Sequence, residues 1–384
     1  MLEIKCDNFA TGPKILVIGV GGGGNNALDR MINSGLSGVK YLAVNTDVQV
    51  LENCRAESKI QIGKKLTKGY GAGADPQIGE AAALENEEEI RTMIEDADMC
   101  IITCGMGGGT GTGAAPIIAK CSKEAGILTV GIVTTPFFFE NTPRIAAAQN
   151  GIEKLKVNVD TLLVIPNDKL LSLSEKPLLV EDAFEMADSV LKYTIEGITN
   201  IVQNKGAVNL DFNDLRTTLL NKGEGHLGIG KVSVDCSVLD AVKQAVNSPL
   251  LDTTIEGAEN ILINTSGKVD VMALSAAINY VRELAGDKVN IIWGTVTEEN
   301  FDQEKLVVTL IATGMSKNRK VTPKSVSRTV TRTTPQEYKR TATTTSERPV
   351  GMPVAKPAVA SLKEKELVIP SFLLEAGKKK HKEG

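Results

Sequence analysis

The sequence predicts an α/β protein with a Rossmann-like first domain, a long central helix, a second, smaller α/β domain and a disordered C-terminal tail. Three observations lead to this prediction. Short apolar runs alternate with amphipathic stretches from Lys14 onward, a long helical pattern follows at residues 179–203, and a second alternating unit ends near Gly314. Beyond Gly314 the composition shifts to Thr, Lys, Arg and Pro. A chain of 384 residues is long enough for two domains and a tail.

The first domain is expected at residues 12–178, after an N-terminal tail of residues 1–11. Its strands are predicted from runs that are apolar almost throughout, namely Lys14–Ile18, Lys40–Asn45, Lys59–Ile62, Met99–Thr103, Leu128–Val133 and Thr161–Ile165. Such runs are typical of strands buried on both faces of a parallel sheet. Helical patterns such as Asn26–Ser34 and Ala114–Ala125 lie between them, so strand and helix alternate as in a doubly wound domain.

The central helix is predicted at residues 179–203, where apolar residues recur every three or four positions. At about 1.5 Å per residue it is roughly 37 Å long, and acidic residues crowd its first turns, as the helix dipole favours. A catalytic loop with a following helix is expected at 204–222, and the second α/β domain at 223–315. The strand and helix patterns of that domain are Gly225–Val234, Val238–Asn247, Glu259–Thr265, Val271–Leu284, Val289–Val296 and Leu306–Thr313.

The C-terminal tail divides into two predicted parts. Residues 316–366 form a disordered basic linker, because they hold almost no large apolar residues that could build a core. Residues 367–384 form a short apolar docking peptide with a basic end. From Ser316 onward the chain carries 16 Lys and Arg against 6 Asp and Glu, whereas the preceding part carries 27 against 41. Such a tail either meets an acidic partner or a membrane surface, or is simply solvated, and both readings stay open.

The composition disfavours several classes of protein. Aromatic residues make up only 4% of the chain, which argues against a nucleic-acid binder that stacks bases. The six cysteines form no C-x-x-C pair and are expected as free, mostly buried thiols. No apolar run reaches the roughly 18 residues of a membrane span. His226 and His381 have no metal-ligand spacing and are interpreted as surface residues. Together these features predict a cytoplasmic protein.

Two glycine-rich segments, each between a predicted strand and a predicted helix, carry the main functional signal: Ile18–Leu28 (IGVGGGGNNAL) and Cys104–Pro116 (CGMGGGTGTGAAP). Glycines let the backbone approach phosphates closely, and a helix N-terminus favours their charge. The first segment alone would also fit a Rossmann dinucleotide site or a tight structural turn. The second holds so many glycines that a phosphate-binding nest is the better explanation.

With their flanks, these segments resemble the tubulin/FtsZ GTPase family, whose signature loop has the form GGGTGTG. Other family segments are matched in order by Val44–Asp47, Gly69–Pro76, Pro136–Arg144, Ile165–Asp168 and Asn209–Leu215. The resemblance covers residues 12–315. The chain has no G-x-x-x-x-G-K-[ST] motif, which agrees with a family whose site relies on backbone amides and helix dipoles in place of a lysine charge.

The resemblance implies a site for GTP and GDP. Its phosphate loops would be Gly22, Gly23, Gly24, Asn25 and Asn26, with Asn26 near the guanine, and Gly109, Thr110 and Gly111. Its remaining contacts would be Ala72, Gly73 and Ala74 at the γ-phosphate, Glu140 and Arg144 at the ribose, and Asn167, Phe184 and Asp188 at sugar and base. The carboxylate of Asp188 can accept both N1–H and the exocyclic amine of guanine, although it also fits a residue that only complements the helix dipole.

Catalysis is implied for Asn209, Asp211 and Asp214, in the loop that follows the long helix. Within one subunit this loop is expected far from the glycine segments, so the family's solution is that it enters the GTP site of the next subunit. There Asp211 and Asp214 would polarise and position the attacking water. The simpler alternative is that Asp211 caps the following helix. Asp47 and Gln49 are weak candidates for a Mg²⁺ contact, mostly through water, and a turn role for Asp47 is equally open.

The implied function is a GTPase that polymerises head to tail into filaments of the cytokinetic ring at the mid-cell division site of a bacterium. Mg²⁺ and, as a further candidate, K⁺ would accompany the nucleotide. The partners would be further copies of the chain and, through Ile369–Leu373, membrane anchors and regulators of division; membrane contact is then indirect and no nucleic acid is expected.

Three other functions are weighed against this one. A tubulin-like filament for plasmid partition or cell shape stays open. A dinucleotide-dependent oxidoreductase is disfavoured by the GGGTGTG segment, and a regulator that does not hydrolyse is disfavoured by Asp211 and Asp214.

Overall fold

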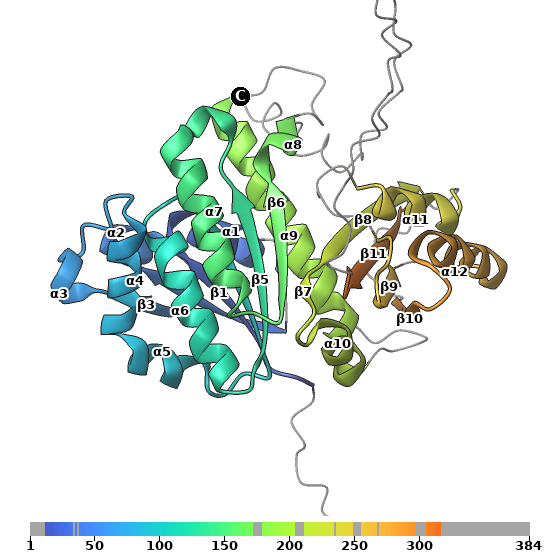
Figure 1. The fold of residues 1–384 in the computed structure, drawn as a ribbon, viewed down its shortest axis with the longest axis horizontal. Coiled ribbons are helices and arrows are strands. Elements are labelled where there is room, and N and C mark those ends of the chain that lie inside the picture. Colours follow the sequence, from blue (N-terminus) through green and yellow to red (C-terminus); the bar gives the residue numbers. More distant parts are fainter. Residues whose placement is uncertain are drawn as a thin grey trace, which may run out of the picture. The chain divides into compact units, whose positions relative to one another are not determined.

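The computed structural model describes residues 12–33, 35–36, 38–171, 179–203, 211–233, 236–248, 255–266, 269–296 and 305–315. One sheet in this part of the chain has the strand order β3-β2-β1-β4-β5-β6-β7, and all its neighbouring strands are parallel (Figure 1). The strands are β1 (Ile15–Val20), β2 (Val39–Asn45), β3 (Ser58–Gln61), β4 (Met99–Gly105), β5 (Leu128–Thr135), β6 (Thr161–Pro166) and β7 (Gly223–Glu224). The prediction of a Rossmann-like α/β domain is confirmed.

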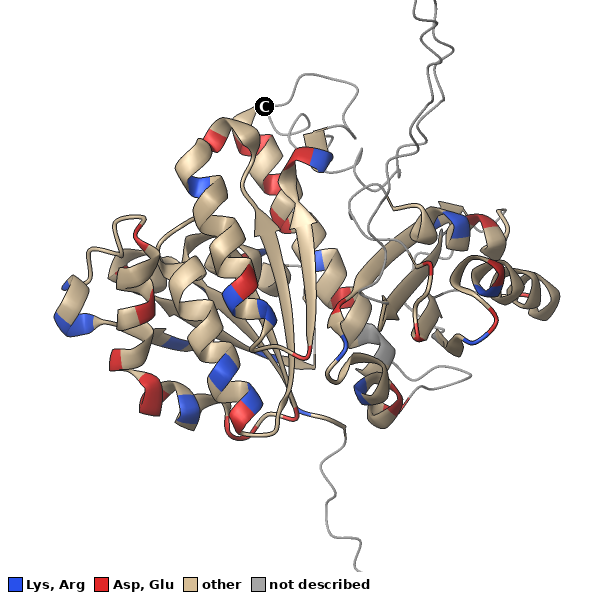
Figure 2. Cartoon of the chain, in the orientation of Figure 1, with Lys and Arg blue, Asp and Glu red and all other residues tan. Residues whose placement is uncertain are grey.

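Helices cover both faces of this sheet. They are α1 (Gly21–Asn33), α2 (Val48–Asn53), α3 (Lys64–Thr67), α4 (Pro76–Glu85), α5 (Glu87–Ile94), α6 (Thr110–Glu124), α7 (Thr142–Lys156), α8 (Asn167–Leu171), α9 (Val180–Gln203) and α10 (Phe212–Leu219), with the 3₁₀ turn η1 (Phe138–Glu140). Successive strand residues face opposite sides. Ile15 and Val17 of β1 pack with α1 and α9, whereas Leu16 and Ile18 pack with α4, α5, α6 and α7. Charged residues therefore gather on the outer helices and are almost absent from the strands (Figure 2).

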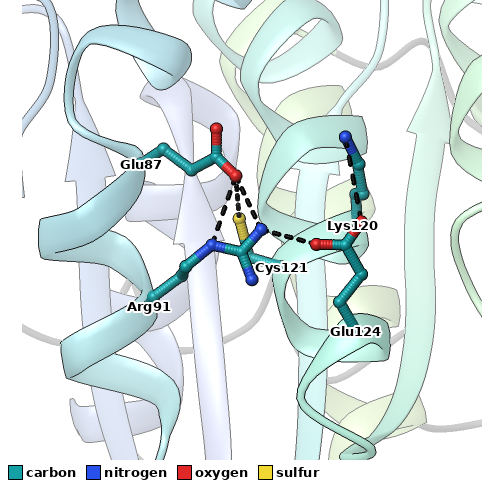
Figure 3. Close-up of polar contacts among 5 residues, drawn as sticks. All are labelled: Glu87, Arg91, Lys120, Cys121 and Glu124. Carbon is teal, nitrogen blue, oxygen red and sulfur yellow. Dashed lines mark hydrogen bonds and ion pairs between the residues drawn. The ribbon is translucent and has the colours of Figure 1, made fainter.

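Charged side chains surround a buried thiol between α5 and α6 (Figure 3). The Arg91 guanidinium lies 2.6 Å from Glu87 Oε1 in α5 and 2.5 Å from Glu124 Oε2 in α6. The Sγ of Cys121 lies 3.9 Å from the same Glu87 oxygen, and burial raises the pKa of this thiol to about 11. Ion pairs as exposed as these add little stability, so the apolar core beneath them holds the two helices together.

The second sheet has the strand order β10-β9-β11-β8. Its elements are β8 (His226–Ser233), α11 (Val238–Val246), β9 (Asn260–Ser266), α12 (Val271–Ala285), β10 (Asn290–Val296) and β11 (Lys305–Thr313), close to the predicted ranges. Strand β9 is parallel to β10, and β11 is antiparallel to both β9 and β8. His226 begins β8 opposite Ala312 and is only 1% exposed, so its interpretation as a surface residue is wrong.

Helix α9 is packed against both sheets. Its buried residues Ile195 and Ile198 share one apolar core with Leu262 of β9 and Ile311 of β11. Mid-helix, Gly197 allows β11 to approach closely, because a Cβ there would lie 2.9 Å from Thr309 Cγ2. The helix thus contributes to a core that reaches both sheets.

Several predictions lie outside the described residues: the tail at 1–11, the linker at 316–366, the docking peptide at 367–384 with Ile369–Leu373, His381, and the loop residue Asn209. The domain bounds 12–178, 179–203, 204–222 and 223–315 stay predictions. No helix in the described part of the chain is long and apolar enough to cross a bilayer. The described cysteines are free, and four of them, Cys54, Cys100, Cys104 and Cys121, are buried as predicted.

Candidate functional site

A cavity of about 280 Å³ lies at the carboxyl edge of the large sheet, where β1 leads into α1 and β4 into α6. The strand order reverses between β1 and β4, and parallel sheets commonly bind ligands at such a point. Its lining residues are Val20, Gly21, Gly22, Gly23, Gly105, Met106, Gly108, Gly109, Thr110, Gly111, Thr134, Pro136, Glu140, Arg144, Asn167, Phe184, Ala187 and Asp188. Ten of the sixteen predicted nucleotide contacts are therefore brought together here.

The first glycine segment forms the opening turn of α1, which begins at Gly21. Packing accounts for some of its glycines, because a Cβ on Gly24 would lie only 2.5 Å from the Thr103 carbonyl oxygen. A Cβ on Gly22 would meet no atom of the described chain within 4 Å, and Gly22 lines the cavity. The first N–H groups of a helix have no partner within the helix and attract anions. This turn is therefore a candidate phosphate site, and the space beside Gly22 is open to a ligand.

The second glycine segment begins α6 at Thr110 and mixes two kinds of glycine. A Cβ on Gly109 would lie 2.8 Å from Ala72 Cβ, and one on Gly113 would lie 2.1 Å from the Pro76 carbonyl oxygen. Packing against residues 72–76 of the same chain thus gives these two glycines a structural reason as well, and a phosphate contact for Gly109 stays a prediction. Gly108 has no atom within 4 Å of an added Cβ and lines the cavity, as Gly22 does.

Hydrogen bonds between loops hold this segment in place. The hydroxyl oxygens of Thr110 and Thr46 lie 2.6 Å apart, and the Thr112 hydroxyl accepts the N–H of Gly107 at 2.8 Å. Both bonds are buried, and a hydrogen bond is stronger in such a low-dielectric environment than in water. They therefore help to fix the backbone beside the cavity.

The predicted γ-phosphate segment, Ala72, Gly73 and Ala74, lies against Gly109 but does not line the cavity. Ala72 is 4% exposed, whereas Gly73 and Ala74 are exposed and both have positive φ, +58° and +62°. The segment therefore makes a tight turn at the border of the phosphate region, and its contact with a phosphate stays a prediction.

At the rim, Arg144 Nη1 donates to Glu140 Oε2 at 2.7 Å, and Glu140 Oε1 accepts the Phe137 N–H at 3.0 Å. Asn167 begins α8 directly after β6 and is 4% exposed. Its Oδ1 is buried without a hydrogen-bond partner in the described part of the chain. A buried acceptor in a cavity wall is costly unless a ligand donates to it, and a ribose hydroxyl or a base N–H would do so.

Phe184 and Asp188 stand one turn apart on α9 and line the same cavity. The Phe184 ring is 40% exposed and is held edge-on by Phe137 and Phe139, with centroids 5.3 Å and 6.4 Å away. The side chain of Asp188 is 14% exposed, and burial raises the pKa of its carboxyl to about 6. An aromatic ring beside a carboxylate acceptor suits a planar base that carries N–H donors.

Arg30 of α1 is a residue that the sequence interpretation missed. Its Nε donates to Asp188 Oδ2 at 3.1 Å and its Nη1 to Glu185 Oε1 at 2.8 Å. The only signal in the sequence is the spacing of four residues from Asn26, which places both on one helical face.

Three predicted residues of the first glycine segment, Gly24, Asn25 and Asn26, do not line the cavity. Asn25 is 1% exposed and locks the turn, since its Nδ2 donates to the Gly19 carbonyl and its Oδ1 accepts from Asn45, both at 2.8 Å. Asn26 is exposed. These residues shape or flank the site in the described structure, and a guanine contact for Asn26 stays a prediction.

Asp47 and Gln49 also lie outside the cavity lining. Asp47 caps α2, and its Oδ1 accepts the N–H of Gln49 at 2.9 Å and that of Val50 at 3.4 Å. Among the described residues, no group of three or more His, Cys, Asp or Glu is arranged to hold a metal ion. The turn role is thus present, and any Mg²⁺ contact would fall to the second carboxylate oxygen.

Asp211 and Asp214 are placed at the opposite edge of the sheet. Asp211 caps α10, with its Oδ1 accepting the Asp214 N–H at 2.8 Å. The far end of α10 meets the start of β6, where the Thr161 hydroxyl donates to the Leu219 carbonyl at 2.5 Å. The cavity lies at the carboxyl end of the same sheet, and α9 extends about 22 Å from Asp188 to its last residue. One copy of the chain therefore does not bring these aspartates to the cavity.

Comparisons with known proteins agree with this arrangement. Residues 14–175 match the model of the GTPase domain of the tubulin/FtsZ family, and residues 223–316 match the FtsZ family C-terminal domain. A solved structure described as an empty FtsZ dimer from M. jannaschii is 42% identical, with a TM-score of 0.75 over 79% of this chain and 89% of that one.

More distant structures share the fold alone. CetZ1 from Haloferax volcanii, described as a GDP-bound monomer, is 23% identical, with a TM-score of 0.68 over 79% of this chain and 95% of that one. CetZ2 from the same organism, described as a protofilament with GTPγS, is 18% identical, with a TM-score of 0.68 over 79% of this chain and 94% of that one. The two matched domains and the 42% identity to a solved FtsZ establish that the chain belongs to the tubulin/FtsZ family of GTPases.

Proposed function

We propose that the chain binds GTP in the cavity and hydrolyses it to GDP and phosphate only where a second copy docks head to tail over that cavity. Repeated docking builds a filament that serves the cytokinetic ring in the cytoplasm of a dividing bacterial cell. The observation that carries this proposal is the separation of the cavity from Asp211 and Asp214 within one chain.

The cavity offers candidate nucleotide contacts, and the carboxylates in its described lining are assigned to the ribose and the base rather than to catalysis. Among the described lining residues the carboxylates are Glu140 and Asp188. Glu140 is bonded to Arg144 and to the Phe137 N–H, and Asp188 is bonded to Arg30. The group that orients the attacking water is therefore assigned to a neighbouring copy of the chain.

Asp211 and Asp214 suit that task. Within the described part of the chain, the cap of α10 uses Oδ1 of Asp211, which leaves its second oxygen and the Asp214 carboxylate as candidates to orient a water. Phosphoryl transfer depends mostly on positioning and charge stabilisation, which two such carboxylates provide when a neighbouring copy holds them at the γ-phosphate. Asn209 would add a polar contact in the same loop.

Mg²⁺ would neutralise charge on the phosphates, and K⁺ is a further candidate ion. Mg²⁺ normally keeps several waters and takes one or two protein carboxylates together with phosphate oxygens. Asp47 fits such a minor role, because the cap of α2 uses Oδ1, and no hydrogen bond to Oδ2 is found among the described residues.

Self-association and division are supported by the relatives. The 42% identical FtsZ is described as a dimer, and the more distant CetZ2 as a protofilament. The match of residues 223–316 to the FtsZ C-terminal domain favours division over plasmid partition or cell shape, which the CetZ likeness alone would fit equally. We further propose that Ile369–Leu373 docks division-site membrane anchors and regulators.

The test is GTP turnover per subunit as a function of protein concentration, with light scattering in parallel, for the wild type and Asp211→Asn. We expect turnover and scattering to rise at one threshold concentration, and Asp211→Asn to scatter light without turning over. Turnover per subunit that is constant down to the lowest concentration and unchanged by Asp211→Asn would contradict the proposal.

A further inference from the structure

Arg30 contacts Asp188, a carboxylate that lines the cavity together with Phe184. It belongs to α1, does not line the cavity, and donates from Nε to Asp188 Oδ2 at 3.1 Å. Its Nη1 donates to Glu185 Oε1 at 2.8 Å, so two carboxylates of α9 fix the direction of the guanidinium. The Arg30 side chain is 35% exposed, against 14% for Asp188. Two hydrogen bonds thus hold the guanidinium against a carboxylate that lines the cavity.

This geometry matters for recognition of a base. Guanine presents N1–H and an exocyclic amine side by side, and a carboxylate accepts both only when it is ionised and correctly rotated. A carboxylate oxygen has two acceptor sites, so Oδ2 can bond Arg30 and still accept from a ligand. A protonated carboxyl carries an O–H donor and offers one acceptor fewer to this edge of the base.

Three influences act on the ionisation of Asp188. Burial disfavours the charged form most strongly, and the nearby charge of Glu185 acts in the same direction. Arg30 opposes both through its charge and its hydrogen bond. The resulting pKa of about 6 leaves the carboxyl ionised at neutral pH by a narrow margin, so the loss of Arg30 would raise the pKa towards neutrality or above.

We propose that Arg30 is a positioning residue for purine selection, which holds the Asp188 carboxylate ionised and in the rotation that accepts both donors of a guanine. This inference rests on the proposed function, in which Asp188 contacts the base. Glu185 has two effects. It forms an ion pair with Arg30, and its negative charge raises the pKa of Asp188.

The test compares binding of GDP with that of inosine diphosphate, which lacks the exocyclic amine, by titration calorimetry of nucleotide-free full-length protein from pH 5.5 to 8.5. The diphosphates avoid turnover during the titration. The wild type should prefer GDP by at least roughly tenfold at pH 7.5 and lose this preference below pH 6. In Arg30→Gln the preference should be lost at pH 7 and regained at higher pH, with the midpoint about one unit higher or more.

Two variants act as matched controls. Arg30→Lys keeps a positive charge, so its midpoint should stay closer to that of the wild type than the midpoint of Arg30→Gln. Glu185→Gln removes a negative charge and should move the midpoint in the opposite direction, to lower pH. A purely structural role of Arg30 would lower the affinity for both nucleotides alike and move no midpoint. An unchanged preference and midpoint in both Arg30→Gln and Arg30→Lys would overturn the inference.

Asp188→Asn separates this inference from the proposed function. If Asp188→Asn abolishes the preference for GDP while Arg30→Gln and Arg30→Lys do not, Asp188 contacts the base but Arg30 does not position it. If Asp188→Asn also keeps the preference, the base site itself is wrong, and both the inference and that part of the proposed function fail.

Discussion

Glycines around the cavity differ in what an added side chain would meet, and this difference separates packing from ligand binding. A Cβ on Gly24 would clash with the Thr103 carbonyl and one on Gly113 with that of Pro76. Gly22 and Gly108 have open space and line the cavity. Because the protein itself does not need glycine at these two positions, the free space there fits phosphates.

Gly22→Ala should therefore weaken nucleotide binding at least tenfold without loss of stability, since alanine in a helix is roughly 0.5–1 kcal/mol more favourable than glycine. Gly24→Ala is the matched control two residues away, and overpacking against Thr103 should cost it roughly 1–3 kcal/mol of unfolding free energy. Urea unfolding and GDP titration of both variants measure these effects. Destabilisation of Gly22→Ala with unchanged affinity would show that Gly22 serves packing instead.

At the level of single residues, the sequence predicted residues that line the cavity but not the residue that holds one of them in place. Gly22 and Gly109 belong to glycine-rich patterns that the sequence displays, Glu140 and Phe184 were implied by the family resemblance, and all four line the cavity. The pairing of Arg30 with Asp188 joins residues 158 positions apart and depends on how α1 packs beside α9. No local feature of the sequence predicts that these two side chains are in contact.

Helices α1 and α6 begin earlier than their predicted ranges at Asn26 and Ala114. The structure starts them at Gly21 and Thr110, inside the glycine-rich segments. Glycine and threonine have low helix propensity, so the sequence pattern does not predict that the first turn of each helix is helical. The strand that ends just before, and the packing of these glycines on neighbouring backbone, decide where the helix starts. For that reason several of the amides proposed to bind phosphate belong to the first turns of the helices.

Asp211 caps helix α10, which begins at Phe212, so the proposed catalytic residue also has a structural role. Asp211→Ala should lower the free energy of unfolding by about 1 kcal/mol, while Asp211→Asn, an equally good cap, should change it by only a few tenths. Both should abolish turnover. Ser237→Ala removes the cap of α11 and should cost similar stability while turnover persists. Equal turnover in Asp211→Asn and the wild type would leave Asp211 as a cap only.

On the scale of the whole molecule, the α/β class was predictable because each strand and helix carries its own periodicity. The six apolar runs became β1 to β6, and the central helix became α9 within one residue of its predicted start. The strand order and the separation of Asp211 from the cavity arise from packing between elements distant in sequence. The resemblance to a family, more than the pattern, indicated that a second copy would complete the site.

The central claim is that two copies share one active site, and complementation between two inactive variants tests it most directly. Asp211→Asn keeps the cavity, whereas Gly22→Glu, at a position where an added Cβ would meet no described atom, places a negative charge that repels phosphates and keeps Asp211. Mixed at equal concentration, with co-sedimentation confirming that both assemble, they form junctions in which one copy supplies a loaded cavity and the other an intact Asp211. We predict that each variant alone is inactive and that the mixture hydrolyses GTP. A mixture that co-assembles and stays inactive would show that cavity and aspartate must belong to the same chain.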